Sequence, residues 1–358
     1  CGEKEEELNL MITGGPDGDL GANEIQCYQG NICLVVDGGS VLFDPEGLDK
    51  EALRSIAFQR HTSPRANSTA FPPEKLHRNG FIVPIGASNI SLPDGRIIAD
   101  GALFHRSFLI DPANRALIEE ANIRAFIPCG GFKDTINHGN AGQFAALFQE
   151  LRFIVEGANL FFDDAARRYL AQQTAILQIK DFSANKGGVF SSSVAEVLPA
   201  FLLQERYQAV LLEDKQSRWA LVRNILDMVA AYARLETELL LKWREQDPSW
   251  PLFELSRLAS EHIFSFQHSL FQRLPEILAN EGLVERVLSL YVPMILQEKL
   301  GLPFIRATLG TAELSVYRDA IITKKLASMA FYRYGLQWQS YLEEVEKEPI
   351  AALLKAVE

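Results

Sequence analysis

Five short apolar runs, each followed by a turn containing Gly or Asn, constrain the fold of the first 200 residues more than any other feature. The runs are residues 8–13, 32–37, 125–128, 153–156 and 175–179. Helical patterns separate them, and strands that alternate with helices build a mostly parallel sheet covered on both faces. We therefore predict an α/β fold with a doubly wound sheet.

The second part of the chain has a different pattern. From residue 201 to residue 358, Gly is sparse, helical periodicity dominates, and prolines such as Pro251 and Pro293 mark helix ends. We predict two domains, an α/β domain over residues 1–200 and an all-helical C-terminal domain over residues 201–358. Residues 219–243 predict a long amphipathic helix that packs on the α/β part or, alternatively, forms an oligomer interface. The full-length protein is expected to be a homo-oligomer.

Composition excludes several classes of function. The net charge is −11 and no Lys/Arg-rich block occurs, which argues against a nucleic-acid partner. No run of about 18 apolar residues occurs, so no membrane span is expected. No Cys/His cluster has the spacing of zinc ligands, and no metal is expected. The four cysteines form no C-x-x-C pair, which favours a protein of the reducing cytoplasm.

The turn after the first apolar run reads G-G-P-D-G-D-L-G over residues 14–21 and opens a helical pattern. Glycines at such a turn let the backbone approach a pyrophosphate and direct N–H groups at it. The usual spacing is G-x-G-x-x-G, but here one extra residue separates Gly15 from Gly18, so an ordinary turn remains an alternative. Asp17 and Asp19 would also repel a pyrophosphate unless they point away or are paired.

Asp37 ends the second apolar run. A carboxylate at this place can accept a hydrogen bond from an adenosine ribose and would repel a 2′-phosphate. A glycine turn followed by such a strand end is a Rossmann-like arrangement, so the expected cofactor is NAD rather than NADP. The alternative is that Asp37 only shapes the turn before Gly38 and Gly39.

Three later turns also follow apolar runs, at residues 128–131 (P-C-G-G), 156–159 (E-G-A-N) and 185–189 (N-K-G-G-V). An Asn side chain can satisfy both the donor and the acceptor of a carboxamide such as that of nicotinamide. Residues 191–193, three serines, are expected to begin the next helix. A serine there can hold a carboxylate together with the helix N–H groups, or it can simply cap the helix.

In this order, the turns resemble those of the glutamate dehydrogenase superfamily, and most of all the large NAD-dependent enzymes of the fungal type. The pieces that carry the resemblance are G-G-P-D-G-D-L-G-A-N-E-I (14–25), D-P-E-G-L-D (44–49), I-P-C-G-G (127–131), I-V-E-G-A-N-L-F-F (154–162) and S-A-N-K-G-G-V-F-S-S-S (183–193). They span residues 11–200. The large enzymes carry the same G-P-D-G-D form, so the resemblance accounts for the extra residue in the first turn.

The resemblance implies a role for particular residues. The pyrophosphate would face Gly15, Gly18, Asp19, Leu20 and Gly21, and the adenosine ribose would face Asp37. Pro128 and Cys129 would flank the cofactor, and Asn159 and Asn185 would lie near the nicotinamide. Ser192 would bind the substrate carboxylate. One residue departs from the family pattern: a Glu is expected shortly after the serine, but Ala195 stands there and Glu196 follows one step later.

The implied reaction is oxidative deamination of L-glutamate to 2-oxoglutarate and ammonia with hydride transfer to NAD. The alternatives are a dehydrogenase of leucine, phenylalanine or valine, and a non-catalytic NAD-binding regulatory module. In the superfamily a substrate domain with the catalytic lysine and aspartate precedes the glycine turn, and the segment before the turn is too short here to hold it. We therefore assign no catalytic residue, expect Lys186 to be solvated, and expect this chain alone to be inactive.

Overall fold

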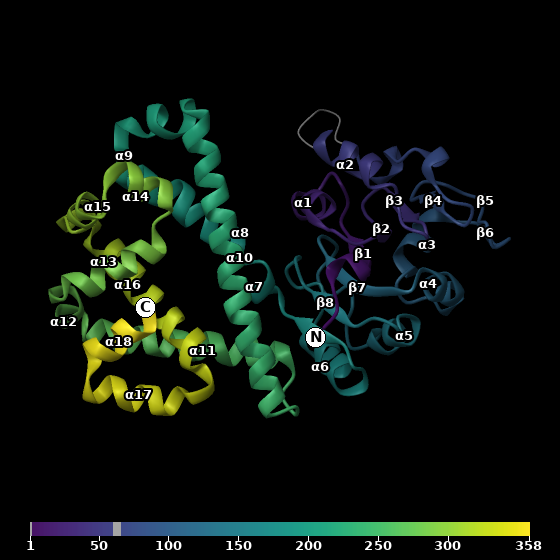
Figure 1. Cartoon of the computed structure of the whole chain (residues 1–358). Coiled ribbons are helices and arrows are strands. Elements are labelled where there is room, and N and C mark those ends of the chain that lie inside the picture. The colour runs from purple at the N-terminus through teal and green to yellow at the C-terminus, as the bar shows by residue number, and fades with distance from the viewer. Residues whose placement is uncertain (1, 60–65) are drawn as a thin grey trace. The chain divides into compact units, whose positions relative to one another are not determined.

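The computed structural model describes residues 2–59 and 66–358. The chain forms two compact units, Cys1–Asn185 and Lys186–Glu358 (Figure 1). The sequence pattern placed the change of architecture at residue 200, whereas the second unit already contains helix α8 (Gly187–Ser191). Helix α8 packs against another part of the same unit, since a Cβ atom added to Gly187 would lie 3.3 Å from Cγ1 of Val229.

A seven-stranded sheet forms the centre of the first unit, in the order β4-β3-β2-β1-β7-β8-β9. Its strands are β1 (Asn9–Thr13), β2 (Ile32–Val36), β3 (Ser40–Phe43), β4 (Phe81–Pro84), β7 (Ile123–Pro128), β8 (Phe153–Val155) and β9 (Leu177–Ile179). Strands β1, β2, β7, β8 and β9 pair in parallel. Each of these five overlaps one of the five apolar runs, so the predicted mostly parallel sheet is confirmed.

Strands β3 and β4 were not anticipated. Both are antiparallel to their neighbours and extend the sheet beyond β2. The connection from β2 to β3 is a tight turn in which the Asp37 N–H donates to the Ser40 carbonyl at 3.2 Å. Antiparallel strands need only such a short turn, whereas parallel strands need a crossover.

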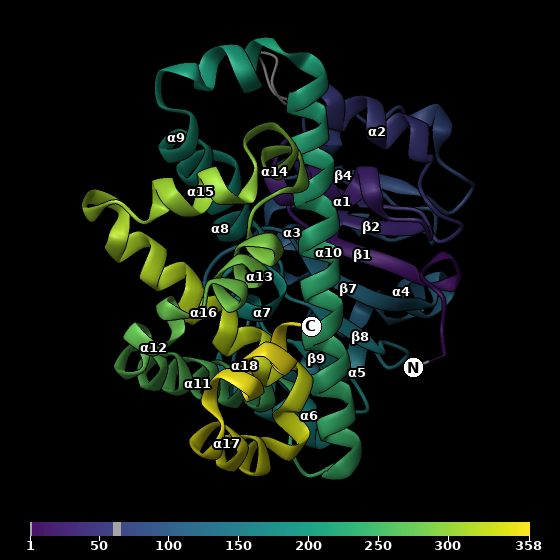
Figure 2. The ribbon, with the colours of Figure 1, turned by 60° about the vertical axis from the view of Figure 1, so that its left-hand side comes forward.

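Helices cover both faces of this sheet (Figure 2). They are α1 (Asp19–Cys27), α2 (Lys50–Phe58), α3 (Gly101–Ser107), α4 (Arg115–Ala121), α5 (Ala141–Leu147), α6 (Asp164–Gln173) and α7 (Asp181–Ala184). Successive strand residues point to opposite faces. Along β1, Leu10 therefore belongs to one core cluster together with Ile25 of α1, whereas Met11 belongs to another with Phe144 of α5. The doubly wound fold is confirmed.

A β-hairpin also lies within residues 89–99. Strands β5 (Ile90–Ser91) and β6 (Ile97–Ile98) are antiparallel. Gly95 takes the left-handed conformation that the turn requires, with φ +86°, and its N–H donates to the Leu92 carbonyl at 3.0 Å.

The second unit is all helical, as predicted. Its helices after α8 are α9 (Leu198–Leu203), α10 (Lys215–Gln246), α11 (Leu252–Gln272), α12 (Leu274–Ala279), α13 (Glu281–Tyr291), α14 (Met294–Leu300), α15 (Leu302–Leu309), α16 (Ser315–Tyr334), α17 (Trp338–Lys347) and α18 (Pro349–Val357). Pro251 and Pro293 directly precede α11 and α14, where a missing N–H costs no helical hydrogen bond.

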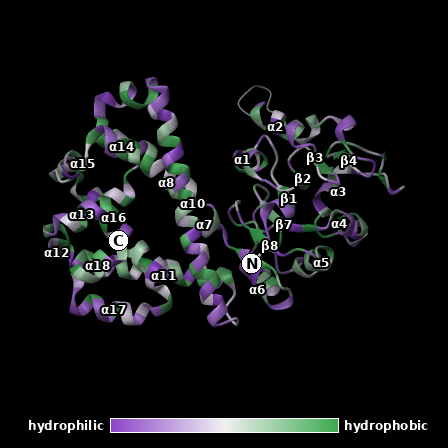
Figure 3. Cartoon of the chain, in the orientation of Figure 1, coloured by the Kyte–Doolittle hydropathy of each residue, from purple (hydrophilic) through white to green (hydrophobic). Residues whose placement is uncertain are grey.

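Amphipathic packing holds these helices together. Figure 3 shows hydrophobic and hydrophilic residues interleaved along them, as expected of helices that share a core. At that core the Trp338 ring centroid lies 5.1 Å from that of Phe266 and 4.9 Å from that of Phe331. Within the described ranges, none of the helices has the length and apolar character needed to cross a bilayer.

The core of the first unit centres on Phe126 of β7, which is fully buried. Its ring centroid lies 5.5 Å from that of Phe161, 6.0 Å from that of Phe144 and 6.1 Å from that of Phe162. We expect Phe126→Ala to lower the free energy of unfolding by about 3–5 kcal/mol, because it leaves a cavity among these rings. Urea denaturation followed by circular dichroism measures the loss.

The matched control is Phe58→Ala. Phe58 ends α2 and is 71% exposed, so its loss should change the free energy of unfolding by no more than about 0.5 kcal/mol. Similar shifts of the urea midpoint in the two variants would contradict a core centred on Phe126.

Candidate cofactor-binding site

The carboxyl ends of β1 and β7 meet at the switch point of the sheet, where β2 follows on one side of β1 and β7 lies on the other. Ligands of open α/β sheets bind in the crevice outside such a point. The two turns that leave these strands touch: a Cβ atom on Gly14 would lie 2.7 Å from the Gly130 nitrogen. The Thr13 carbonyl accepts from the Cys129 N–H at 2.7 Å, and Thr13 Oγ1 donates to the Gly130 carbonyl at 2.6 Å.

The glycine turn after β1 is equally tight. A Cβ atom on Gly21 would lie 2.3 Å from the Gly15 carbonyl oxygen, so no side chain fits there. Gly18 caps α1, and its N–H donates to the Gly15 carbonyl at 3.1 Å, which closes the turn around the extra residue. Asp19 and Leu20 begin α1 and are exposed.

Asp37 lies against this turn, because a Cβ atom on Gly15 would come within 1.9 Å of Asp37 Oδ2. The carboxylate is 4% exposed. Its Oδ1 accepts from the N–H groups of Gly39 (2.8 Å) and Ser40 (3.1 Å) and from the Ser68 hydroxyl (2.5 Å). Its Oδ2 accepts from the Ser68 N–H at 2.8 Å. Among the described residues, Oδ1 thus accepts three hydrogen bonds and Oδ2, beside Gly15, accepts one. Both oxygens of an ionised carboxylate are acceptors, so Oδ2 is the one with capacity for a further donor.

Ser68 is a residue of this site that sequence reasoning missed. It is fully buried and donates to Asp37 from both its backbone and its side chain, and its hydroxyl also lies 2.6 Å from the Ser40 hydroxyl. The segment from residue 66 to residue 80 carries no pattern that points to β2, so only the folded chain brings Ser68 to this carboxylate.

Pro128 ends β7 and Cys129 follows it directly. The Pro128 carbonyl accepts from the Ala158 N–H at 2.6 Å, which joins the turn after β7 to the turn after β8. Burial, together with the negative charge of Glu24, raises the pKa of the Cys129 thiol above its ordinary value. Cys129 is therefore a neutral thiol at physiological pH and a poor nucleophile.

Asn159 and Asn185 lie side by side. The Asn185 Nδ2 group donates to Asn159 Oδ1 at 2.5 Å and to the Gly157 carbonyl at 3.0 Å. Both N–H bonds of the Asn185 amide are thus engaged, as is the Asn159 oxygen. The Asn159 amide N–H bonds and the Asn185 amide oxygen take no part in these two hydrogen bonds. The pair offers one donor group and one acceptor in neighbouring positions.

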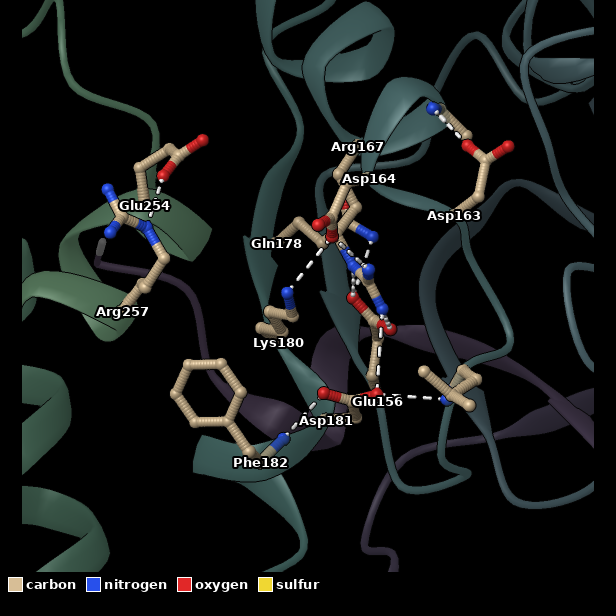
Figure 4. Close-up of polar contacts among 12 residues, drawn as sticks. Glu156, Asp163, Asp164, Arg167, Gln178, Lys180, Asp181, Phe182, Glu254 and Arg257 are labelled. Carbon is tan, nitrogen blue, oxygen red and sulfur yellow. Dashed lines mark hydrogen bonds and ion pairs between the residues drawn. The ribbon is translucent and has the colours of Figure 1, made fainter. Parts of the chain in front are cut away.

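A buried ion pair, Glu156 with Arg167, lies at the start of the turn that carries Asn159 (Figure 4). Glu156, the residue before Gly157, is fully buried, and Arg167 is 1% exposed. Arg167 binds it through two hydrogen bonds, Nε to Oε1 at 2.8 Å and Nη2 to Oε2 at 2.6 Å. Gln178 adds a third, from Nε2 to Oε1 at 3.0 Å. Sequence reasoning did not identify this network.

Ser192 belongs to the second unit, whereas the other ten predicted residues belong to the first. The expectation that residues 191–193 begin a helix is wrong, because α8 begins at Gly187 and continues through them into the π-helical segment Ser192–Val197. The Ser192 N–H is bonded within the helix, to the carbonyls of Gly188 and Val189. It is therefore not a free helix-terminal donor, although the Ser192 side chain is exposed.

Lys186 also differs from its expectation. Its ammonium group forms an ion pair with Glu236 of α10 instead of being simply solvated. The same Glu236 oxygen accepts from the Tyr332 hydroxyl at 2.8 Å.

The sequence matches the family model described as Glutamate/Leucine/Phenylalanine/Valine dehydrogenase over residues 3–234. Glutamate dehydrogenase 2 of Dictyostelium discoideum is 32% identical over 97% of this chain and 32% of its own length. The NAD-specific glutamate dehydrogenase of Neurospora crassa is 33% identical over 92% of this chain and 30% of its own length. That of Saccharomyces cerevisiae is 35% identical over 72% of this chain and 22% of its own length.

This chain thus spans a third or less of the length of these relatives. The matches agree with the resemblance that the five sequence pieces indicated, and that prediction is confirmed. The family model covers more than half of the chain. The chain belongs to the Glutamate/Leucine/Phenylalanine/Valine dehydrogenase family.

Proposed function

We propose that this chain is the NAD-binding portion of a glutamate dehydrogenase, which oxidises L-glutamate to 2-oxoglutarate and ammonia with hydride transfer to NAD. The observation that carries the proposal is the gathering of the glycine turn, Asp37 and the Asn159–Asn185 pair at the carboxyl ends of strands of one sheet. The names of the relatives, NAD-specific glutamate dehydrogenase, support both glutamate and NAD.

The adenosine and pyrophosphate half of NAD fits the first two turns. A helix leaves the N–H groups of its first turn without helical partners, and those of α1 follow a backbone that has no room for side chains at Gly15 and Gly21. In the proposed role, the pyrophosphate lies against Gly15, Gly18, Asp19, Leu20 and Gly21. Asp37 Oδ2, which accepts one hydrogen bond from the described residues, receives one ribose hydroxyl.

The nicotinamide half fits the asparagine pair. A carboxamide has one oxygen acceptor and one NH₂ donor, which match the Asn159 N–H and the Asn185 oxygen. Pro128 and Cys129 flank the ring in this proposal, and the neutral thiol adds no charge beside it. NAD supplies the carbon that accepts the hydride, whereas this chain binds and orients the cofactor. Ser192 is proposed to hold a substrate carboxylate.

Two other functions stay open to test. The family also contains leucine, phenylalanine and valine dehydrogenases, and a regulatory module would bind NAD without turnover. The complete gene product should be assayed with each of the four amino acids and NAD, following NADH at 340 nm. Faster turnover of leucine, phenylalanine or valine than of glutamate would favour the first alternative. NADH binding without turnover of any of them would favour the second.

We further propose that the complete protein is a cytoplasmic homo-oligomer that acts on small molecules and has no nucleic-acid partner. Free thiols at Cys27, Cys33 and Cys129 support a reducing compartment. The net charge of −11 argues against nucleic acid. Trp219 and Leu226 are exposed apolar side chains of α10 that support self-association.

The role of Asp37 predicts a preference for NADH over NADPH, because the carboxylate would repel a 2′-phosphate. Asp37→Ser removes this repulsion. The dissociation constant of NADPH divided by that of NADH should therefore fall by about tenfold or more, since two charges near a protein surface interact by several kcal/mol at about 4 Å. Fluorescence titration with both nucleotides measures the ratio.

The ratio is the right measure because Asp37 also holds Gly39, Ser40 and Ser68. If the substitution only disturbs the turn, it weakens the binding of both nucleotides equally and leaves the ratio of their dissociation constants unchanged. Equal or tighter binding of NADPH by the unaltered chain would refute the assignment of Asp37.

The asparagine pair makes a second prediction. Asn185→Ala removes an acceptor for the carboxamide and should weaken NAD binding by about 1–2 kcal/mol, because a buried partner then loses its hydrogen bond. Binding of ADP-ribose, which has no nicotinamide, should stay nearly unaltered. Calorimetric titration of both ligands separates the two effects.

Asn79→Ala is the control, since the Asn79 amide donates to Glu120 at an exposed position outside the crevice. It should bind both ligands as the unaltered chain does. An equal loss of NAD and ADP-ribose affinity in Asn185→Ala would show that Asn185 only shapes its turn.

A further inference from the structure

The turn that carries Asn159 contains a strained residue. Leu160 has a φ of +57°, in the left-handed region that leucine rarely adopts. Its side chain is 48% exposed, so burial of the leucine side chain does not account for the conformation. Strained backbone persists only where its surroundings determine it, and it is concentrated at ligand sites. The interactions that hold Leu160 therefore also determine where Asn159 lies.

Two hydrogen bonds to the peptide groups of Leu160 supply that hold. Its N–H donates to Asp181 Oδ2 at 2.9 Å, and its carbonyl accepts from the Asp134 N–H at 2.8 Å. Asp134 is itself left-handed, with φ +53°. Of the two partners, the Asp181 carboxylate is the one that a substitution can remove without altering the backbone.

Asp181 is held in place in turn. It is 5% exposed, and its Oδ1 accepts from the Phe182 N–H at 2.7 Å. Its Oδ2 lies 3.6 Å from Nη2 of Arg167, the cation of the buried pair with Glu156 (Figure 4). These contacts give the carboxylate a fixed position next to the Leu160 N–H.

Asp181 also contacts the other member of the asparagine pair. Its backbone carbonyl accepts from the Asn185 N–H at 2.8 Å, while its side chain holds the residue after Asn159. One residue thus fixes the backbone at both asparagines. Their side chains then meet at 2.5 Å.

We propose that Asp181 is the positioning residue of the asparagine pair: its side chain keeps Leu160 left-handed and so preforms the Asn159–Asn185 arrangement that receives a carboxamide. The ligand part of this inference rests on the proposed function. A preformed pair binds more tightly because less freedom is lost on binding. The competing view is that Asp181 serves only as a counter-ion of Arg167.

The test compares NAD with ADP-ribose in calorimetric titrations of the full chain. Asp181→Ala keeps the backbone carbonyl that binds Asn185 but removes the bond to Leu160. NAD affinity should fall about tenfold, as for the loss of one hydrogen bond to a charged group, whereas ADP-ribose affinity should change less than about twofold. The matched control is Asp164→Ala, which removes another carboxylate of Arg167, bound to Nη1 at 2.7 Å, without touching the turn. It should leave both affinities unaltered.

The decisive variant is the double change Asp181→Ala with Leu160→Gly. Glycine adopts positive φ without strain, so it should take the left-handed conformation even without Asp181 and restore part of the NAD affinity. A counter-ion role predicts no such rescue, because Leu160→Gly does not replace the charge. Absence of rescue, or an equal loss in Asp164→Ala, would overturn the proposal.

A readout without ligand keeps this test separate from the proposed function. The side-chain NH₂ signals of Asn159 and Asn185, observed by NMR with ¹⁵N-asparagine, should move towards those of solvated amides in Asp181→Ala and return in the double variant. Unchanged signals in Asp181→Ala would overturn the positioning role. If the signals respond as expected but the unaltered chain binds NAD no more tightly than ADP-ribose, only the assignment of the carboxamide fails.

Discussion

At the carboxyl ends of β1 and β7, two backbone segments approach so closely that neither has room for a side chain. A Cβ atom on Gly14 would lie 2.7 Å from the Gly130 nitrogen, and one on Gly130 would lie 3.0 Å from the Gly14 Cα atom. This approach lets Thr13 bind the opposite turn with both its carbonyl and its hydroxyl. The crevice floor is therefore made of peptide groups, which can receive an anionic ligand in a chain whose net charge is −11.

Two buried carboxylates near these turns, Asp37 and Asp181, accept hydrogen bonds mainly from the backbone. Asp37 accepts three N–H groups and one hydroxyl, and Asp181 accepts two N–H groups. Each satisfies peptide donors of a turn that has few partners within a strand or helix. Glu156 differs, because its partners are the side chains of Arg167 and Gln178. A buried ion pair of this kind contributes little net stability, but its two parallel hydrogen bonds fix geometry. Here that geometry is the start of the turn that carries Asn159.

Most of the fold could be predicted from local patterns. The five apolar runs became the five parallel strands, because burial on two faces leaves a direct trace in the sequence. Pro251 and Pro293, expected at helix ends, lie at helix boundaries, directly before α11 and α14. Strand β3 was missed although Gly38 and Gly39 between two apolar runs are a hairpin signal. The start of α8 was missed for a related reason. Gly187 and Gly188 indicated a loop, whereas Gly187 begins a helix at a point where Val229 leaves little room for a side chain.

The candidate site was predictable only in part. The residues proposed to face the ligand follow the ends of apolar runs, so their positions in the sequence indicate them. The residues that hold them in place are not indicated by the sequence. Ser68 reaches Asp37 from a segment without a recognisable pattern, and Arg167 reaches Glu156 from the buried face of α6. Such pairs exist only after the chain has folded, so no local periodicity records them.

Leu160 illustrates why a local rule fails at the site. Propensity favours glycine or asparagine at positive φ, and leucine there conflicts with the conformation by roughly 1–2 kcal/mol. Glycine would remove the strain but would also allow many conformations in which Asn159 no longer meets Asn185. Leucine restricts those alternatives, provided that a fixed acceptor offsets its strain. The Asp181 carboxylate, set in place beside the Glu156–Arg167 pair, is that acceptor, so the buried charges determine a turn that the sequence around it does not favour.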